Sequence, residues 1–101
     1  MLFIGIKKSK RKNKRFVFEY VNQENQLKKI HFGLFGGLTY IDHGDNKKRT
    51  AYLKRHFKNE DWYKINPGSL SAKLLWGVNK ELEINLLKYL KHFKFSNIII
   101  N

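Results

Sequence analysis

The placement of positive charge constrains how this chain can fold. The sequence has 21 Lys and Arg against 8 Asp and Glu, a formal net charge of +13. Residues 1–15 and 46–58 contain no acidic residue, and they carry seven and six positive charges, so these two segments account for the whole excess. Unpaired Lys and Arg are almost never buried. A compact fold must therefore keep both segments at its surface.

The same excess predicts a polyanionic partner. Like charges repel one another and destabilise a compact state, which makes a surface of this kind costly unless it is used. Basic charge gathered in patches is the electrostatic signature of nucleic-acid-binding proteins. We expect DNA to be the favoured partner, bound mainly through its phosphates and without sequence preference. The residues expected to contact phosphate are Lys7, Lys8, Lys10, Arg11, Lys12, Lys14, Arg15, Lys47, Lys48, Lys54, Arg55 and Lys58.

Composition excludes several classes of protein. The chain has no Cys, which excludes disulfides, thiolate metal sites and thiol nucleophiles. No apolar run approaches the roughly 20 residues that a membrane-spanning helix needs. The first 15 residues do not resemble a secretory signal, because their short apolar stretch precedes their charges. We expect a non-secreted single domain over residues 1–101, with a basic loop or arm at 7–15.

The pattern of apolar residues predicts an α+β fold. Residues 2–6, 16–21 and 26–32 have the composition of strands, and in 16–21 the aromatic side chains of Phe16, Phe18 and Tyr20 fall on one face. We expect a small N-terminal antiparallel sheet of two to four strands. Residues 98–100 could add an edge strand or dock the C-terminus. The closely spaced glycines between 33 and 37 are interpreted as structural turns, since no phosphate-loop pattern is present.

Two or three helices are expected to pack on this sheet. Residues 46–59 predict a helix with Asp45 as N-cap and with lysines outward on one stripe. Residues 69–76 predict a short helix that ends at Gly77. Residues 80–93 have apolar residues at helical spacing, acids early and lysines late, which is typical of an amphipathic helix.

A second group of unusual residues combines polar and aromatic side chains. We interpret it as a structural polar motif in which Asp42 or Asp45 caps the helix, Arg49 pairs with Asp45 or Glu60, and Tyr52 and His56 pack inward. Alternatives are a partner contact or a small metal-dependent nuclease that would use the histidines and acids. No metal-ligand spacing is recognisable, and we expect no enzyme activity, catalytic residue, metal or cofactor. The members are His31, Asp42, His43, Asp45, Arg49, Tyr52, His56, Glu60 and Trp62.

The order of these residues resembles a known family. The chain reads H-F-G at 31–33, D-H-x-D at 42–45, R-H at 55–56 and L-L-W at 74–76. Over residues 29–76 this pattern is similar to small, basic, uncharacterised proteins of giant nucleocytoplasmic DNA viruses. The resemblance implies a viral protein of the virion and the infected host cell, in cytoplasm or nucleus. Genome packaging would then be the setting for DNA binding. A minor capsid protein whose basic arm binds acidic coat-protein surfaces is the alternative.

Overall fold

A three-stranded antiparallel sheet forms the N-terminal part of the chain in the computed structural model, which describes residues 1–97. The strands are β1 (Leu2–Lys8), β2 (Lys14–Val21) and β3 (Leu27–Leu34), in the order β1-β2-β3. All three predicted strands are confirmed. β1 and β3 end two residues later than predicted, β2 begins two residues earlier, and β3 begins one residue later. The strand expected at 98–100 lies outside the described residues.

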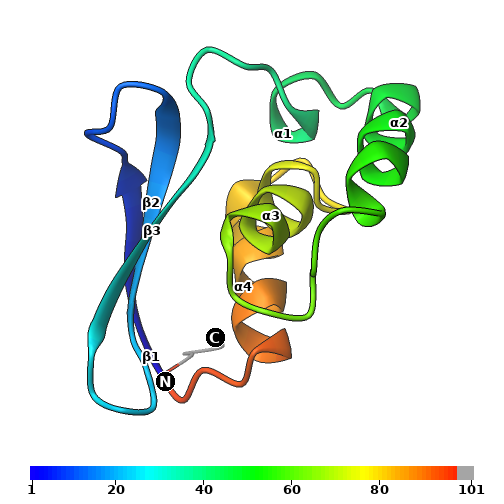
Figure 1. The fold of residues 1–101 in the computed structure, drawn as a ribbon. Coiled ribbons are helices and arrows are strands. Elements are labelled where there is room, and N and C mark those ends of the chain that lie inside the picture. Colours follow the sequence, from blue (N-terminus) through cyan, green and yellow to red (C-terminus); the bar gives the residue numbers. More distant parts are fainter. Residues whose placement is uncertain (98–101) are drawn as a thin grey trace.

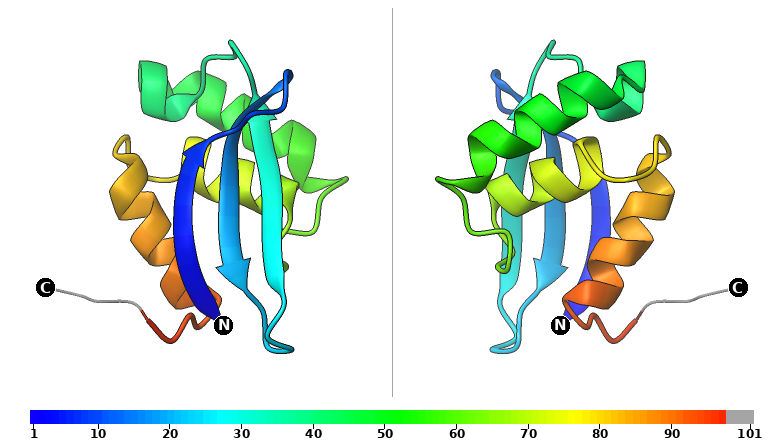
Figure 2. Two further views of the ribbon diagram at one scale, coloured as in Figure 1. Left: turned by 90° about the vertical axis from the view of Figure 1, so that its left-hand side faces the viewer. Right: turned by 90° about the vertical axis from the view of Figure 1, so that its right-hand side faces the viewer.

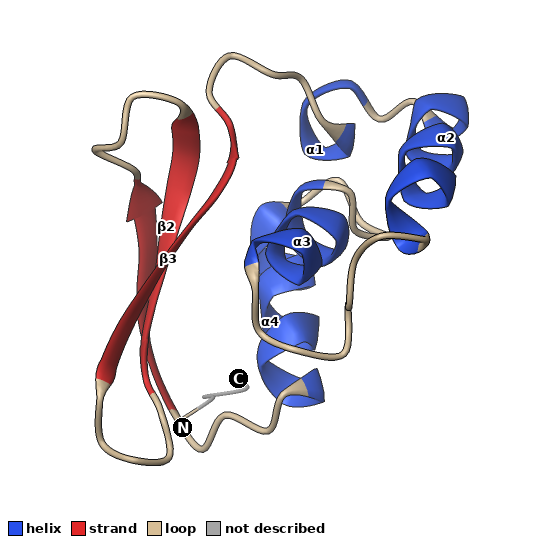
Figure 3. Cartoon of the chain, in the orientation of Figure 1, coloured by secondary structure: helices blue, strands red, loops and turns tan. Residues whose placement is uncertain are grey.

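Helices and the loops that join them make up the rest of the described chain (Figure 3). They are α1 (Tyr40–His43), α2 (Asn46–Phe57), α3 (Pro67–Leu70), a π-helical turn η1 (Ser71–Leu75) that continues α3, and α4 (Leu82–His92). The predicted N-cap of α2 is confirmed, because the carboxylate of Asp45 accepts hydrogen bonds from the backbone N–H groups of Lys47 and Lys48 at 2.9 and 3.2 Å. The short α1 was not predicted. It begins after Thr39 and ends at Gly44, whose φ of 65° is left-handed.

The helices cover one face of the sheet, and within residues 1–97 no other layer covers the opposite face (Figures 1 and 2). The aromatic face of β2 is the covered one, as its alternation predicted. Phe18 and Phe32 are fully buried there and pack with Leu74 and Leu75 from η1 and with Tyr89 from α4. The predicted α+β arrangement of a small sheet and about three C-terminal helices is therefore confirmed.

A buried amide holds the connection between η1 and α4 in place. Asn85 is buried, and its Nδ2 donates to the carbonyl oxygens of Leu74 and Asn79 at 2.9 and 2.7 Å. Its Oδ1 accepts from the backbone N–H of Asn79 at 3.0 Å. Gly77 lies against this amide, so closely that a Cβ there would come within 2.6 Å of Cγ of Asn85 and still nearer the carbonyl oxygen of Lys73. This connection needs a residue without a side chain.

The end of the described chain returns to its beginning. The backbone N–H of Ser96 donates to the carbonyl of Met1 at 3.0 Å. The side chain of Asn97 accepts from the N–H of Phe3 and donates to its carbonyl, both at 2.8 Å. Two backbone groups at the start of β1 thus find partners in a side chain.

Among residues 1–97, no helix has the length and apolar character needed to cross a membrane.

Candidate nucleic-acid interface

The basic segment at 7–15 is a hairpin. Lys7 and Lys8 end β1, and Lys14 and Arg15 begin β2. The turn between them is closed by backbone hydrogen bonds from Ser9 to Arg15 (3.1 Å) and from Lys14 to Arg11 (3.2 Å). Of the two forms predicted for this segment, it takes that of a loop and not of an extended arm. Its charged side chains therefore project from a hydrogen-bonded β-hairpin.

Two of the twelve predicted phosphate contacts are used inside the protein. Lys7 forms an ion pair with Glu19 at 2.8 Å on the uncovered face of the sheet, and this contact lowers the pKa of Glu19. Arg15 donates two hydrogen bonds to Asp42, both at 2.8 Å. Among residues 1–97 the other ten form no ion pair. They are Lys8, Lys10, Arg11, Lys12, Lys14, Lys47, Lys48, Lys54, Arg55 and Lys58, and all of them are exposed.

The pair of Arg15 and Asp42 ties the hairpin to α1. Asp42 also accepts hydrogen bonds from the backbone N–H and the hydroxyl of Thr39, at 2.7 and 2.9 Å. It therefore caps α1, while Asp45 alone caps α2. The bonds from Arg15, with those from Thr39, lower the pKa of Asp42 to about 2.

This pair predicts a loss of stability in acid. The pKa of Asp42 in the unfolded chain is near 3.9, so the pair contributes fully above about pH 4 and is lost as the pH falls towards 2. Its side chain is one-quarter exposed, and solvent screening reduces the contribution to about 1 kcal/mol. We expect Asp42→Asn to lower the free energy of unfolding by about 1 kcal/mol at pH 6 and by much less at pH 2.5. Urea unfolding of both proteins at the two pH values measures this difference.

Glu24→Gln is the control for that measurement, because the Glu24 side chain lies on the exposed β2–β3 turn and makes no hydrogen bond or ion pair among residues 1–97. It should change stability little at either pH. If Asp42→Asn lowers the free energy of unfolding equally at pH 6 and pH 2.5, the ion pair of Asp42 with Arg15 does not cause the acid sensitivity.

The second basic segment is α2, whose exposed side carries its lysines. Lys47, Lys54 and Lys58 are exposed on one stripe, as predicted. Lys48 and Arg55 lie on the neighbouring stripe, towards α1. None of these five side chains has an acid partner among the described residues.

The hairpin and α2 lie at the same end of the molecule, with the connection from β3 to α1 passing between them (Figure 1). A hollow of about 410 Å³ beside the hairpin is lined by Lys8, Phe35 and Leu38. A hollow of about 320 Å³ beside α2 is lined by Leu38, Lys48 and Arg55. Leu38 thus forms a wall of both, and we call the two together the basic end. Phe35 and Leu38 are 71% and 73% exposed.

Phe35 and Leu38 were not singled out from the sequence, although one signal was available. They flank two glycines in F-G-G-L, where the pattern of core residues breaks down. An apolar pair in such a turn is more exposed than in a strand or helix.

Most side chains of the polar motif form hydrogen bonds within the protein, but the pair predicted for Arg49 is wrong. Arg49 contacts neither Asp45 nor Glu60: its Nε donates to the carbonyl oxygens of Trp76 and Gly77 at 2.9 and 3.1 Å. The backbone after η1 offers two free carbonyls there, and the side chain reaches them across the helix interface. Arg49 thereby fastens α2 to the η1–α4 connection.

Tyr52 and His56 of the motif form an aromatic stack with Trp76 on the inner side of α2. Tyr52 stacks on His56 at 4.0 Å and on Trp76 at 4.3 Å between ring centroids. Burial, with the charge of Glu60 nearby, raises the pKa of Tyr52 to about 12. Glu60 accepts hydrogen bonds from His56 (2.7 Å) and from Nε1 of Trp62 (2.8 Å). These contacts agree with the inward packing predicted for Tyr52 and His56.

The histidines considered for a metal site do not converge. His31 bonds to Ser9 at 2.7 Å on the uncovered face of the sheet, and burial, with Arg11 and Lys29 nearby, lowers its pKa. Nδ1 of His43 accepts from the backbone N–H of Asp45 at 2.9 Å, and His56 bonds to Glu60. Within residues 1–97, no three His, Asp or Glu side chains lie close enough together to hold a metal ion.

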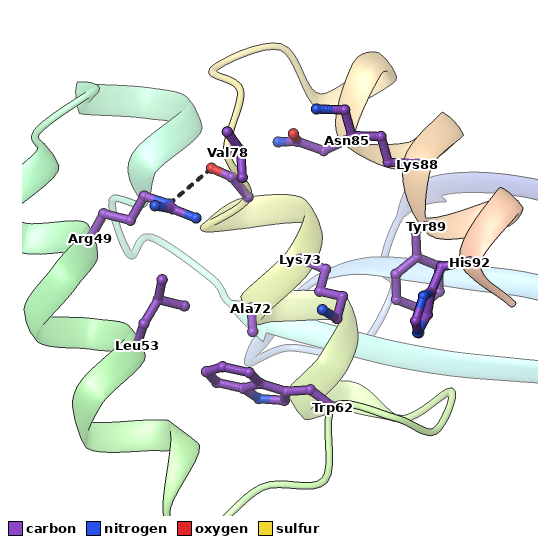
Figure 4. A pocket seen from close by; sticks show the side chains of 11 residues that line it. Arg49, Leu53, Trp62, Ala72, Lys73, Val78, Asn85, Lys88, Tyr89 and His92 are labelled. Carbon is purple, nitrogen blue, oxygen red and sulfur yellow. Dashed lines mark hydrogen bonds between the residues drawn. The ribbon is translucent and has the colours of Figure 1, made fainter.

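A separate pocket lies between α2, η1 and α4, and we call it the α2–α4 pocket (Figure 4). Its volume is about 320 Å³, and its lining includes the basic residues Arg49, Lys73, Lys88 and His92 together with Leu53 and Trp62. Among residues 1–97, no Asp or Glu lines it. Sequence reasoning missed Lys73 and Lys88 as pocket residues, because they lie in different segments of the chain and only the packing of η1 against α4 brings them to one cavity.

Comparison with known proteins gives one match. Residues 4–56 match the DUF5754 family, a family of unknown function. The match covers the sheet from Ile4 onward, α1 and almost all of α2, and it ends before Glu60 and Trp62. No curated protein and no solved structure matches the chain.

Proposed function

The chain belongs to the DUF5754 family, whose function is unknown, and from its own surface we propose that it is a non-enzymatic DNA-binding protein. The basic end would hold the phosphate backbone, without reading base sequence. Phosphate contacts of this kind dominate non-specific binding. The resemblance to proteins of giant DNA viruses leads us to propose genome packaging in a virion as the setting.

The supporting observation is that cations from two distant segments line adjoining hollows and lack acid partners. Lys8 comes from the hairpin, and Lys48 and Arg55 come from α2. The one acid that reaches the hairpin hollow, Asp42, is already paired with Arg15. The positive charges of Lys8, Lys48 and Arg55 are therefore not compensated by nearby acids, and a polyanion would neutralise them.

The exposed aromatic side chain at this end favours a partner with flat rings as well as phosphates. Phe35 is 71% exposed between the two basic segments. Bases of a single strand stack on such side chains. Binding to single strands should accordingly be at least as strong as binding to duplex at equal length.

Salt-titrated binding to duplex DNA, single strands and heparin tests the proposal. If about six Lys or Arg contact duplex phosphates, a plot of log K against log salt should have a slope of about −5. The slope for single strands should be shallower, about −4 for the same six contacts. An affinity for DNA that stays constant from 50 mM to 300 mM salt would contradict binding through phosphate contacts.

An acidic protein surface, such as that of a coat protein, is the second candidate. The observation that favours it is the large exposed apolar side chain of Leu38 beside the cations, because apolar and basic residues together suit a protein interface better than a phosphate backbone. Retention on heparin with no measurable binding to either form of DNA would favour this candidate.

A further inference from the structure

The α2–α4 pocket is distinct from the basic end in what lines it. The basic end is lined by side chains of the hairpin, the β3–α1 connection and the outer side of α2, whereas the pocket is enclosed by the inner side of α2, by η1 and by α4. Its volume of about 320 Å³ falls at the lower end of the range for small-molecule sites. It would hold one small ligand.

The charge of the pocket selects an anion. Lys73, Lys88 and His92 line it from η1 and α4, and Arg49 lines it from α2. In Figure 4 the ammonium of Lys73 points towards Trp62, whereas the side chain of Lys88 extends past Asn85 at the other end. Because no Asp or Glu among residues 1–97 lines the cavity, the ammonium and guanidinium groups have no counter-charge there from the described part of the chain. A phosphate group would supply that charge, and lysine ammonium groups are common phosphate ligands.

Arg49 is held in position for such a ligand. Its Nε is bonded to two backbone carbonyls, those of Trp76 and Gly77. The side chain is therefore fixed from the protein side, and among residues 1–97 its terminal nitrogens donate no hydrogen bond to another residue. A preorganised guanidinium loses less conformational entropy on binding an anion.

The apolar wall of the pocket selects a flat ring. Trp62 and Leu53 line one side of the cavity, and the indole is held by its hydrogen bond to Glu60 and by the edge of Phe57 at 5.5 Å. Figure 4 shows the ammonium of Lys73 on the same side of the cavity as Trp62. A ligand that stacks on the indole could thus place its phosphate near a lysine.

We propose that the α2–α4 pocket binds a nucleoside monophosphate unit, with the phosphate on Lys73, Lys88 and Arg49 and the base against Trp62. The inference rests on the proposed function, since it names one nucleotide of the same ligand class at a second site. Trp62 and Leu53 also line a groove with Lys54, Arg55 and Lys58 of α2, so the unit can be a free nucleotide or the end of a strand bound along that helix.

Titration of the full chain with deoxyadenosine monophosphate, followed by amide chemical shifts, tests the proposal. We expect saturable shifts at Lys73, Val78 and Lys88 and at the Trp62 indole. The double variant Lys73→Gln, Lys88→Gln should weaken this binding about tenfold or more. The matched control Lys64→Gln, Lys91→Gln removes two exposed lysines outside the pocket and should leave the affinity unchanged.

Further ligands separate the two parts of the site. Deoxyadenosine, which lacks the phosphate, should bind at least tenfold more weakly. Trp62→Phe keeps an aromatic wall and should weaken the nucleotide only about threefold, which tests stacking without the risk of unfolding that Trp62→Ala carries. Inorganic phosphate that displaces the nucleotide at equal concentration would overturn the role of the base.

Oligonucleotides distinguish the source of the nucleotide. If a single strand with a 5′-phosphate binds more tightly than the same strand with a 5′-hydroxyl, the pocket holds the end of a strand. If the two strands bind equally and the nucleotide still binds saturably, the pocket holds a free nucleotide. No saturable shift at millimolar nucleotide overturns the proposal. If salt-dependent duplex binding persists in that case, only the pocket inference fails. If the protein binds the nucleotide but does not bind duplex DNA, only the proposed function fails.

Discussion

Gly77→Ala is expected to lower the free energy of unfolding by about 3 kcal/mol, because the new methyl group would overlap two groups that cannot move aside. A Cβ at this position would lie 2.6 Å from Cγ and 2.7 Å from Nδ2 of Asn85, and it would overlap the carbonyl oxygen of Lys73. Asn85 is buried and makes three hydrogen bonds, so displacing it breaks a satisfied network. Thermal and urea unfolding followed by circular dichroism should show a midpoint lower by roughly 15 °C.

Gly5→Ala is the matched control, since a Cβ at Gly5 would meet no heavy atom within 4 Å. This variant should stay within about 0.5 kcal/mol of the parent protein. Equal stability of the Gly5 and Gly77 variants would show that the η1–α4 connection can relax, and that the Asn85 network is not rigid.

Removing four charges from the hairpin should reduce DNA affinity about 4,000-fold at 0.1 M salt if all four contact phosphates. Each phosphate contact contributes about 0.9 to the salt slope, which corresponds to about 0.9 units of log K at this ionic strength. The slope should also decrease by about 3 to 4. The variant carries Gln at Lys10, Arg11, Lys12 and Lys14, all exposed and without ion pairs among the described residues. Fluorescence anisotropy with a labelled duplex at four salt concentrations measures both quantities.

A control with the same loss of charge uses lysines away from the basic end. Gln at Lys28, Lys64, Lys91 and Lys94 removes four exposed positive charges from β3, from the loop before α3 and from the end of α4. This control should lose affinity far less, through the general field alone. Equal losses in the two variants would mean that DNA has no preferred face on the protein.

Much of the fold could be predicted because local signals agree with one another. The alternation of Phe16, Phe18 and Tyr20 identifies the covered face of the sheet, and Asp45 marks the start of α2. The short α1 was missed because four residues show no helical periodicity. Its formation depends on the cap by Thr39 and Asp42 and on the left-handed Gly44.

The candidate site was less accessible to sequence reasoning, since it depends on contacts between distant segments. Charge counting identified the hairpin and α2 but could not show that Arg15 is used by Asp42, 27 residues away. Arg49 was assigned an acid partner, Asp45 or Glu60, as part of a buried polar network. Backbone carbonyls of the η1–α4 connection take that role, and no residue pattern reveals a free carbonyl.

The side chain of Asn97 affects how this protein would behave at high concentration. β1 is an edge strand, and unpaired backbone groups at such an edge invite strands of other molecules to extend the sheet. The carboxamide already occupies both the N–H and the carbonyl of Phe3. A neighbouring chain would have to displace the carboxamide before its own backbone could pair with Phe3. Asn97 therefore opposes the addition of a strand from another molecule at the start of β1.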